Sequence, residues 1–196
     1  DYGVFKVGEI LQTVKKIVGM NYSKKYNIIY ADPPYRFKTY SDKGKGRSAD
    51  NHYVCMPLDD ICKLPISNIS ADDCILFMWI IDPFLKDAFK IIESWGFTYK
   101  TIAFTWCKIN KISDSWFTGM GYWTRSNPEI CLLATKGKPK RESKSVKQLV
   151  FSRLQHHSKK PDVIRDKIVE LCGDLPRIEL FARNKYKGWD SWGNEL

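Results

Sequence analysis

The residues with the clearest chemistry in this sequence are Asp32, Pro33, Pro34 and Tyr35, which directly follow the apolar run 27–31. The run predicts a short buried strand, because it is rich in β-branched and aromatic residues and ends at two prolines, which cannot continue a ladder of hydrogen bonds. Open α/β sheets hold their ligands at the carboxyl ends of their strands. The pattern therefore predicts a carboxylate at a ligand-binding edge.

The two prolines also predict how such a ligand would be held. Proline has a fixed φ and no N–H, so the carbonyls of this segment are rigid acceptors beside Asp32. Asp32 can accept one hydrogen of a flat amino group, a carbonyl of the proline segment can accept the other, and Tyr35 can stack on the ring. A nucleobase has this chemistry. A plain turn capped by an aspartate is the alternative, because Asp-Pro-Pro is a common sequence.

The composition favours a polyanionic partner. The 196 residues include 32 Lys and Arg against 22 Asp and Glu, a formal net charge of +10. An excess of this size favours nucleic acid over a membrane, with a merely basic protein as the alternative. The aromatic content is 14%. Aromatic rings near basic residues hold unstacked bases, although most of these rings are expected in the core.

Several classes of protein are not expected. None of the six cysteines forms a Cys-x-x-Cys pair and the three histidines show no His-Glu-x-x-His spacing, so neither a disulfide framework nor a metal site is predicted. The run 74–81 is too short to span a bilayer, and no signal peptide is expected. Reduced, buried thiols in a cytoplasmic protein fit this cysteine usage.

The hydrophobic pattern predicts one α/β domain over residues 1–196. Strands alternate with amphipathic helices, which predicts a doubly wound sheet. We expect helices at 4–20, 57–64, 83–95 and 161–172, and strands at 27–32, 73–81, 98–107, 129–135, 149–151 and 177–182.

Two long segments without periodicity, 38–50 and 108–127, are expected to be loops. Long loops in compact domains are usually functional, so we expect both to grip an extruded base, with ordinary surface loops as the alternative. In the first loop Lys43, Lys45 and Arg47 are candidates for phosphate contacts, unless this basic stretch is only a solvated surface.

A series of ordered motifs resembles the MT-A70 family of adenine-N6 methyltransferases, which includes the catalytic subunit of the eukaryotic messenger-RNA adenosine methyltransferase. The similar part covers about residues 26–196, and its arrangement and length resemble bacterial and phage members most, which implies a cytoplasmic protein of bacterial or phage origin. The motifs are 31–35, 51–53, 76–79, 121–125 with Glu129, 157–162, 179–183 and 188–194.

The resemblance implies a Rossmann-like fold in permuted order, with the catalytic motif before the cofactor motif. Few residues precede Asp32, so we expect the cofactor half to follow it. No Gly-x-Gly-x-x-Gly follows any expected strand, and in this family segment 179–183 takes that role.

The resemblance also implies S-adenosylmethionine as cofactor. Lys160 would meet its methionine carboxylate, and Asn194 and Glu195 its ribose hydroxyls. A solvated lysine and, for Arg183, a surface ion pair are the alternatives. The eukaryotic subunit has a histidine and an asparagine at Lys185 and Tyr186, and the family usually has a tryptophan at Tyr35. The implied cofactor contacts are Asp32, Lys160, Arg183, Asn184, Lys185, Tyr186, Asn194 and Glu195.

The expected reaction is direct in-line methyl transfer to adenine N6 in DNA, with Asp32 and a proline carbonyl binding the amino group. A methyltransferase that acts on cytosine C5 would need a nucleophilic cysteine, usually after a proline, and this sequence has no Pro-Cys pair. The base must leave its stack, and Tyr53, Trp123, Arg125 and Glu129 are candidates to line its pocket or are structural residues. RNA is the alternative substrate, and a catalytically silent nucleic-acid-binding subunit is the alternative class. A homodimer or a partner subunit stays open.

Overall fold

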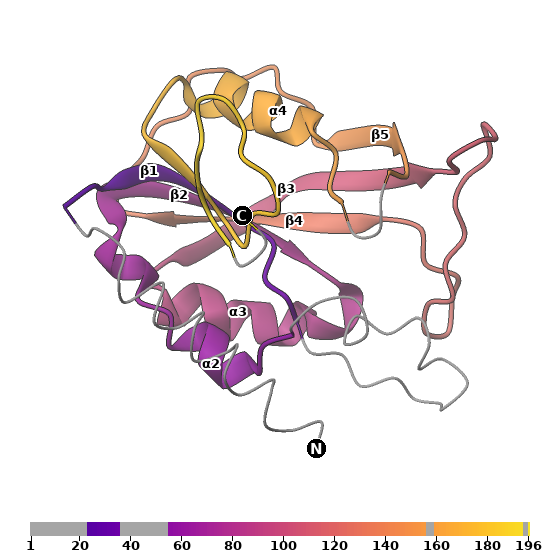
Figure 1. Ribbon diagram of the computed structural model, residues 1–196, viewed down its shortest axis with the longest axis horizontal. Helices are drawn as coiled ribbons and strands as arrows, with labels where there is room; N and C mark the ends of the chain where they lie inside the picture. Colours follow the sequence, from indigo (N-terminus) through magenta and orange to yellow (C-terminus); the bar gives the residue numbers. More distant parts are fainter. Residues whose placement is uncertain (1–22, 36–54, 156–158, 194–195) are drawn as a thin grey trace.

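The computed structural model describes residues 23–35, 55–155, 159–193 and 196. Within these residues, seven strands form one sheet in the order β5-β3-β4-β2-β1-β6-β7 (Figure 1). The strands are β1 (Tyr26–Ala31), β2 (Ser70–Ile80), β3 (Thr98–Ile109), β4 (Glu129–Lys136), β5 (Leu149–Arg153), β6 (Arg177–Leu180) and β7 (Asp190–Trp192). The helices are α2 (Leu58–Cys62), α3 (Leu85–Ser94) and α4 (Val163–Cys172), with short 3-10 turns η3 (Ile66–Asn68) and η4 (Asp82–Phe84).

Helices cover both faces of the sheet, with α2 and α3 on one face and α4 on the other (Figure 1). The alternation of side chains along a strand divides the core accordingly. In β1, Ile29 packs on the α3 side and Tyr30 on the α4 side; in β2, Met78 and Trp79 divide in the same way. Both faces of these central strands are buried, which explains their almost continuous apolar sequence. The predicted doubly wound sheet is confirmed.

The direction of each strand determines which residues lie together at the ligand-binding edge of the sheet. Strand β1 pairs in parallel with β2 and β6, whereas β4 is antiparallel to both β2 and β3. The carboxyl ends of β1 and β6 therefore lie at the same edge of the sheet. Because β4 runs the other way, its first residue, Glu129, lies at that edge too, next to the end of β2 where Ile80 pairs with Ile130.

The structure differs from the sequence prediction at element ends and in one strand. Strand β2 begins at Ser70 and β3 runs on to Ile109. Segment 190–192 was predicted only as part of a motif, yet it forms β7 by parallel pairing with β6. Its partner lies ten or more residues away, so local periodicity does not reveal it. The predicted helix 4–20 and loop 38–50 lie outside the described residues.

The predicted loop 108–127 is held in place by its own hydrogen bonds. The Asn127 amide donates to the carbonyl of Lys108 at 3.0 Å and to that of Phe117, and its oxygen accepts from the Lys108 N–H at 3.2 Å. This side chain therefore closes the long connection between β3 and β4. Among the described residues, no helix is both long and apolar enough to cross a bilayer.

Candidate active site at the carboxyl edge of the sheet

Three segments that are distant in sequence place charged side chains together beside the end of β1. Asp32 follows β1 directly, and its Oδ2 accepts a hydrogen bond from Lys160 Nζ at 2.8 Å. Lys160 Nζ also lies 3.2 Å from Glu129 Oε2. The sequence predicted Asp32 and Lys160 at the cofactor and Glu129 at the substrate. The structure places all three in one group.

Lys108 extends this group, although the sequence analysis did not select it. Its Nζ lies 2.6 Å from Glu129 Oε1 and sits over the rings of Trp106 and Phe117, at 5.4 and 5.7 Å from their centroids. We call Asp32, Lys160, Glu129 and Lys108 the four-charge network. Its side chains are 31%, 11%, 19% and 13% exposed in that order. Asp32 is therefore the member most accessible to a ligand.

The charges in the network reinforce one another. Burial acts to raise the pKa of Glu129, but Lys160 and Lys108 outweigh it, and the net pKa is lowered. Burial acts to lower the pKa of Lys160, but the carboxylates of Asp32 and Glu129 outweigh it, and the net pKa is raised. Glu129 and Lys160 therefore both keep their charges at neutral pH.

The proline segment is held by backbone hydrogen bonds. The carbonyl of Pro33 accepts from Tyr35 N–H at 2.9 Å, and that of Pro34 accepts from Met56 N–H at 2.8 Å. Each carbonyl oxygen has a second lone pair. Binding of an amino group by this segment stays a prediction that uses those remaining lone pairs.

Tyr35 is packed as a core side chain. It is 6% exposed, its hydroxyl donates to the carbonyl of Trp79 at 3.0 Å, and its ring stacks on Phe84 with centroids 5.1 Å apart. Burial raises its pKa well above the usual value. In this arrangement one ring face is covered by Phe84. A role as stacking platform for a base stays a prediction, and it requires the other face.

The segment after β6, predicted to hold the cofactor, contains a strained turn. Phe181 has φ +60°, a left-handed conformation that is uncommon for a residue other than glycine. Such conformations cost free energy and collect at functional sites. Ala182 N–H bonds the carbonyl of Trp192 at 2.9 Å, and a Cβ at Gly193 would lie 2.0 Å from the Ala182 oxygen. Only glycine at position 193 therefore permits this close approach.

Arg165 of α4 and Glu179 of β6 form a buried ion pair next to that segment. They form two hydrogen bonds, Nε–Oε2 at 2.7 Å and Nη2–Oε1 at 2.6 Å. The Arg165 guanidinium also lies 3.5 Å from the Tyr186 ring centroid, and Asp162 accepts hydrogen bonds from Tyr186 at 3.0 Å and from Arg165 at 3.1 Å. The buried pair therefore joins α4, β6 and the turn that carries Tyr186.

The Arg165–Glu179 pair was not predicted, although the sequence pattern contained a signal for it. Arg165 lies three residues before Ile168 and seven before Cys172, on the buried face of α4. In β6, Ile178 and Leu180 face the α3 side, so alternation turns Glu179 toward α4. A cation on an apolar helix face and an acid on an apolar strand predict a buried ion pair.

The other predicted site residues lie farther out or outside the described residues. Trp123 and Arg125 are exposed in the connection between β3 and β4, and Asn184 and Lys185 are exposed after β6, whereas Arg183 is partly buried. In the described part of the chain, no group of three or more His, Cys, Asp or Glu side chains could hold a metal ion. The predicted residues outside the described ranges are Lys43, Lys45, Arg47, Tyr53, Asn194 and Glu195.

Comparison with known proteins shows similarity along most of the sequence. The MT-A70 family model matches residues 26–195. The type II methyltransferase M.MunI of Mycoplasma sp is 37% identical over 190 residues, which cover 88% of this chain and 78% of that protein.

Human relatives are more distant and much longer. The human N(6)-adenosine-methyltransferase catalytic subunit METTL3 is 27% identical over 88% of this chain and 28% of its own length. The human N(6)-adenine-specific methyltransferase METTL4 is 26% identical over 90% of this chain and 39% of its own length. This chain therefore spans most of the Mycoplasma protein but less than half of either human relative.

Proposed function

Because this chain belongs to the MT-A70 family of S-adenosylmethionine-dependent methyltransferases, we propose that it methylates the N6 amino group of adenine in DNA. The family predicted from the sequence motifs is confirmed, and so are the Rossmann-like fold and S-adenosylmethionine as cofactor. The observation that carries the proposal is the position of Asp32, accessible at the carboxyl end of β1 and bound by Lys160.

The charges at this edge fit the cofactor. The methionine part of S-adenosylmethionine bears a carboxylate, an ammonium and a sulfonium. Lys160 supplies a cation for the carboxylate, and Asp32 and Glu129 supply anions for the positive groups. The strained turn at Phe181 lies at the end of β6, which pairs with β1. We assign Asp32, Lys160 and segment 183–186 to hold the cofactor, which supplies a methyl group carried on sulfur.

Asp32 has the central role toward the base. The lone pair of an adenine amino group is delocalised into the ring, so the nitrogen is a weak nucleophile. A hydrogen bond from this group to Asp32 favours the pyramidal nitrogen that can react. Such a charge-assisted bond contributes about 1.5–3 kcal/mol, and it strengthens as the nitrogen becomes positive in the transition state.

Lys160 and Glu129 position that carboxylate. Lys160 binds Oδ2 of Asp32, so we assign Oδ1 to the amino group. Glu129 in turn binds both Lys160 and Lys108, which fixes the lysine against the end of β1. Holding the reacting groups in place in this way supplies much of the rate enhancement in such transfers.

Two features support DNA as the substrate. The Mycoplasma relative, 78% of which is covered by this chain, carries the name type II methyltransferase. The net charge of +10 suits a polyanion. RNA is the second candidate, because the name of human METTL3 refers to adenosine. A catalytically silent subunit is disfavoured, since Asp32 and Lys160 are both present and paired.

The test is transfer of radiolabel from S-adenosylmethionine to unmethylated double-stranded DNA or single-stranded RNA. We expect N6-methyladenine in DNA, and a rate at least about 100-fold lower for Asp32→Asn, since removal of one transition-state contact costs on this order. Asp166→Asn, on the exposed face of α4, is the matched control. Label only in RNA would overturn the substrate, and no label in either would overturn the function.

A further inference from the structure

We propose that a cavity on the outer edge of the sheet binds a second, unstacked base of the same nucleic acid, next to the target adenine. This inference rests on the proposed function. The cavity measures about 280 Å³ and lies between the β3–β4 connection and β5. Its walls include Trp116, Phe117, Arg125, Asn127 and Phe151. The connection extends beyond the body of the sheet in Figure 1.

Two exposed aromatic rings form the outer wall. Trp116 is 59% exposed and Phe151 is 52% exposed, and their ring centroids lie 5.6 Å apart with a tilt of 46°. Large rings of this kind normally lie in the core, so their exposure indicates a ligand. Every nucleobase has a flat π-face, and aromatic platforms bind unstacked bases whatever their sequence. The size is too small for an extended ligand and suits one ring system.

The charge around the cavity favours a polyanion over a protein partner. Segments 107–127 and 149–155 carry four cations, Lys108, Lys111, Arg125 and Arg153, and one acid, Asp114. Lys108 is paired with Glu129 and Arg153 with Asp114, so Lys111 and Arg125 make up the excess positive charge. Arg125 lines the cavity itself and is exposed. An aromatic platform beside an arginine is the arrangement that combines base stacking with a phosphate contact.

The walls of the cavity are joined by backbone and side-chain hydrogen bonds. Trp116 bridges to Ile109, and Phe117 N–H bonds the Lys108 carbonyl at 3.0 Å. From β5, Arg153 donates to the carbonyls of Asn110 at 3.0 Å and Ser113 at 2.9 Å. The aromatic wall is therefore presented without ordering a loop on binding, which lowers the entropic cost of association.

Phe117 and Lys108 lie between the cavity and the active edge. Phe117 lines the cavity, Lys108 lies over its ring at 5.7 Å, and Lys108 binds Glu129 at 2.6 Å. Glu129 in turn meets Lys160, which binds Asp32. A base in the cavity and an adenine at Asp32 can therefore belong to one substrate, and Lys108 is the contact between the two positions.

The experiment places 2-aminopurine at the target position and at each neighbouring position of an oligonucleotide, and records its fluorescence on binding without the methyl donor. Stacking on Trp116 is expected to quench one neighbouring position. In Trp116→Ala and Phe151→Ala that quenching is lost, and the KM for the oligonucleotide rises about 5- to 100-fold. The KM for S-adenosylmethionine stays within about twofold, because the cofactor residues are unchanged.

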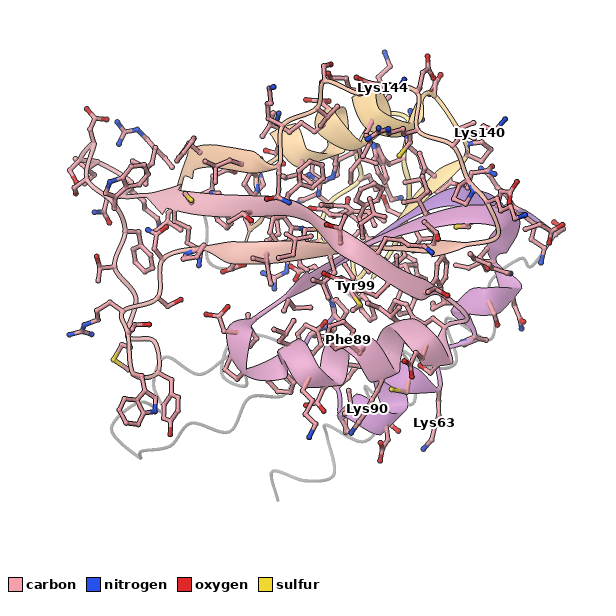
Figure 2. All side chains as sticks on the ribbon, turned by 180° about the vertical axis from the view of Figure 1, so that it is seen from behind. Lys63, Phe89, Lys90, Tyr99, Lys140 and Lys144 are labelled. Atoms are coloured by element: carbon pink, nitrogen blue, oxygen red, sulfur yellow. The ribbon has the colours of Figure 1, made fainter. Side chains whose placement is uncertain are left out.

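Tyr99→Ala is the matched control. Tyr99 also has an exposed ring, paired with Phe89 of α3 at 5.1 Å between centroids, away from the cavity (Figure 2). It should leave both KM values and the quenching unchanged. Unchanged quenching and KM in Trp116→Ala would overturn the inference. So would a wild-type oligomer that dissociates in Trp116→Ala in light scattering, because the rings would then contact a protein.

The two proposals fail separately. Position-specific quenching without any methyl transfer would overturn the proposed function and support the cavity. Methyl transfer together with unaltered quenching and KM in Trp116→Ala and Phe151→Ala would support the proposed function and overturn the assignment of the cavity.

Discussion

The four-charge network and the Arg165–Glu179 pair are both groups of opposite charges, but they meet solvent differently. The network joins side chains from four segments and ends at Asp32, which is one-third exposed. The Arg165–Glu179 pair is buried on both sides and closed by two parallel hydrogen bonds. The first group can exchange a partner for a ligand, whereas the second cannot.

The difference in exposure indicates that the four-charge network serves ligand binding, whereas the Arg165–Glu179 pair serves the stability of the fold. In the network, Lys160 and Glu129 each touch two opposite charges, so loss of one contact leaves another. The Arg165–Glu179 pair fixes α4 against β6, and its loss leaves an uncompensated buried charge. We therefore expect substitutions in the network to affect catalysis most and substitutions in the pair to affect stability most.

The largest change in stability is expected for Glu179→Gln. It leaves the Arg165 guanidinium buried with only the partly exposed Asp162 nearby, and loss of one partner of a buried pair costs about 3–5 kcal/mol. Urea unfolding measures the change. The double variant Arg165→Met/Glu179→Leu should recover most of the free energy of unfolding. A double variant as unstable as Glu179→Gln would show that the ion pair stabilises the fold by more than the free energy needed to bury its two charges.

A smaller change in stability is expected for Glu129→Gln, together with a clear loss of methyl transfer. Lys160 keeps Asp32, but Lys108 loses its 2.6 Å ion pair, and an unsatisfied buried polar group costs about 1–3 kcal/mol. Urea unfolding and single-turnover rates separate the two effects. A loss of stability as large as that of Glu179→Gln would contradict the redundancy of the network.

Within the network, Glu129 and Lys160 should lose their stabilisation at opposite ends of the pH range. The folded pKa of Glu129 lies below its ordinary 4.5, so its stabilisation is complete above 4.5 and is lost as the pH falls. Lys160 has a pKa above its ordinary 10.5 and loses its stabilisation only as the pH rises past that value.

Unfolding free energies measured from about pH 3 to pH 6 test these signs. Glu129→Gln should reduce the acid-side loss of stability, because this carboxylate then no longer has to be protonated. An unchanged pH dependence in Glu129→Gln would contradict the role of this carboxylate.

The smallest effect is expected for an exposed pair. Lys63 lies 3.6 Å from Asp60 on α2 and points away from the sheet (Figure 2). Exposed pairs contribute about 0–1 kcal/mol, because water screens them. Lys63→Ala should therefore leave the free energy of unfolding within about 0.5 kcal/mol of the wild type. A larger loss of unfolding free energy in urea would show that the exposure of an ion pair does not determine its contribution to stability in this protein.

Much of the fold could be predicted from local patterns. The apolar run before Asp32 and the two prolines predict β1 and its end, and the spacing of Ile164 and Ile168 predicts α4. The motif order predicted the family before any comparison. Strand β7 was missed as a strand, because it is three residues long and exists only through pairing with β6.

The candidate site could be predicted only in part. Asp32, Lys160 and Glu129 were chosen from motifs, but their mutual contacts were not. Lys108 was not predicted as a site residue, because a single lysine near the end of a strand belongs to no sequence motif. The burial of Tyr35 by Phe84 and its hydrogen bond to Trp79 were not predicted, and its expected stacking on a base stays a prediction. Side-chain packing of this kind depends on residues far apart in sequence.

The sequence by itself determined the end of β1 at the two prolines, the excess of positive charge and the motif that places a carboxylate after β1. These follow from backbone sterics, side-chain periodicity and charge, which are properties of neighbouring residues. Only the tertiary structure decided which charges meet. The antiparallel direction of β4 brings Glu129 to the edge where β1 ends, and the packing of α4 on β6 pairs Arg165 with Glu179. Such contacts depend on long-range strand pairing and burial, which no local window of sequence contains.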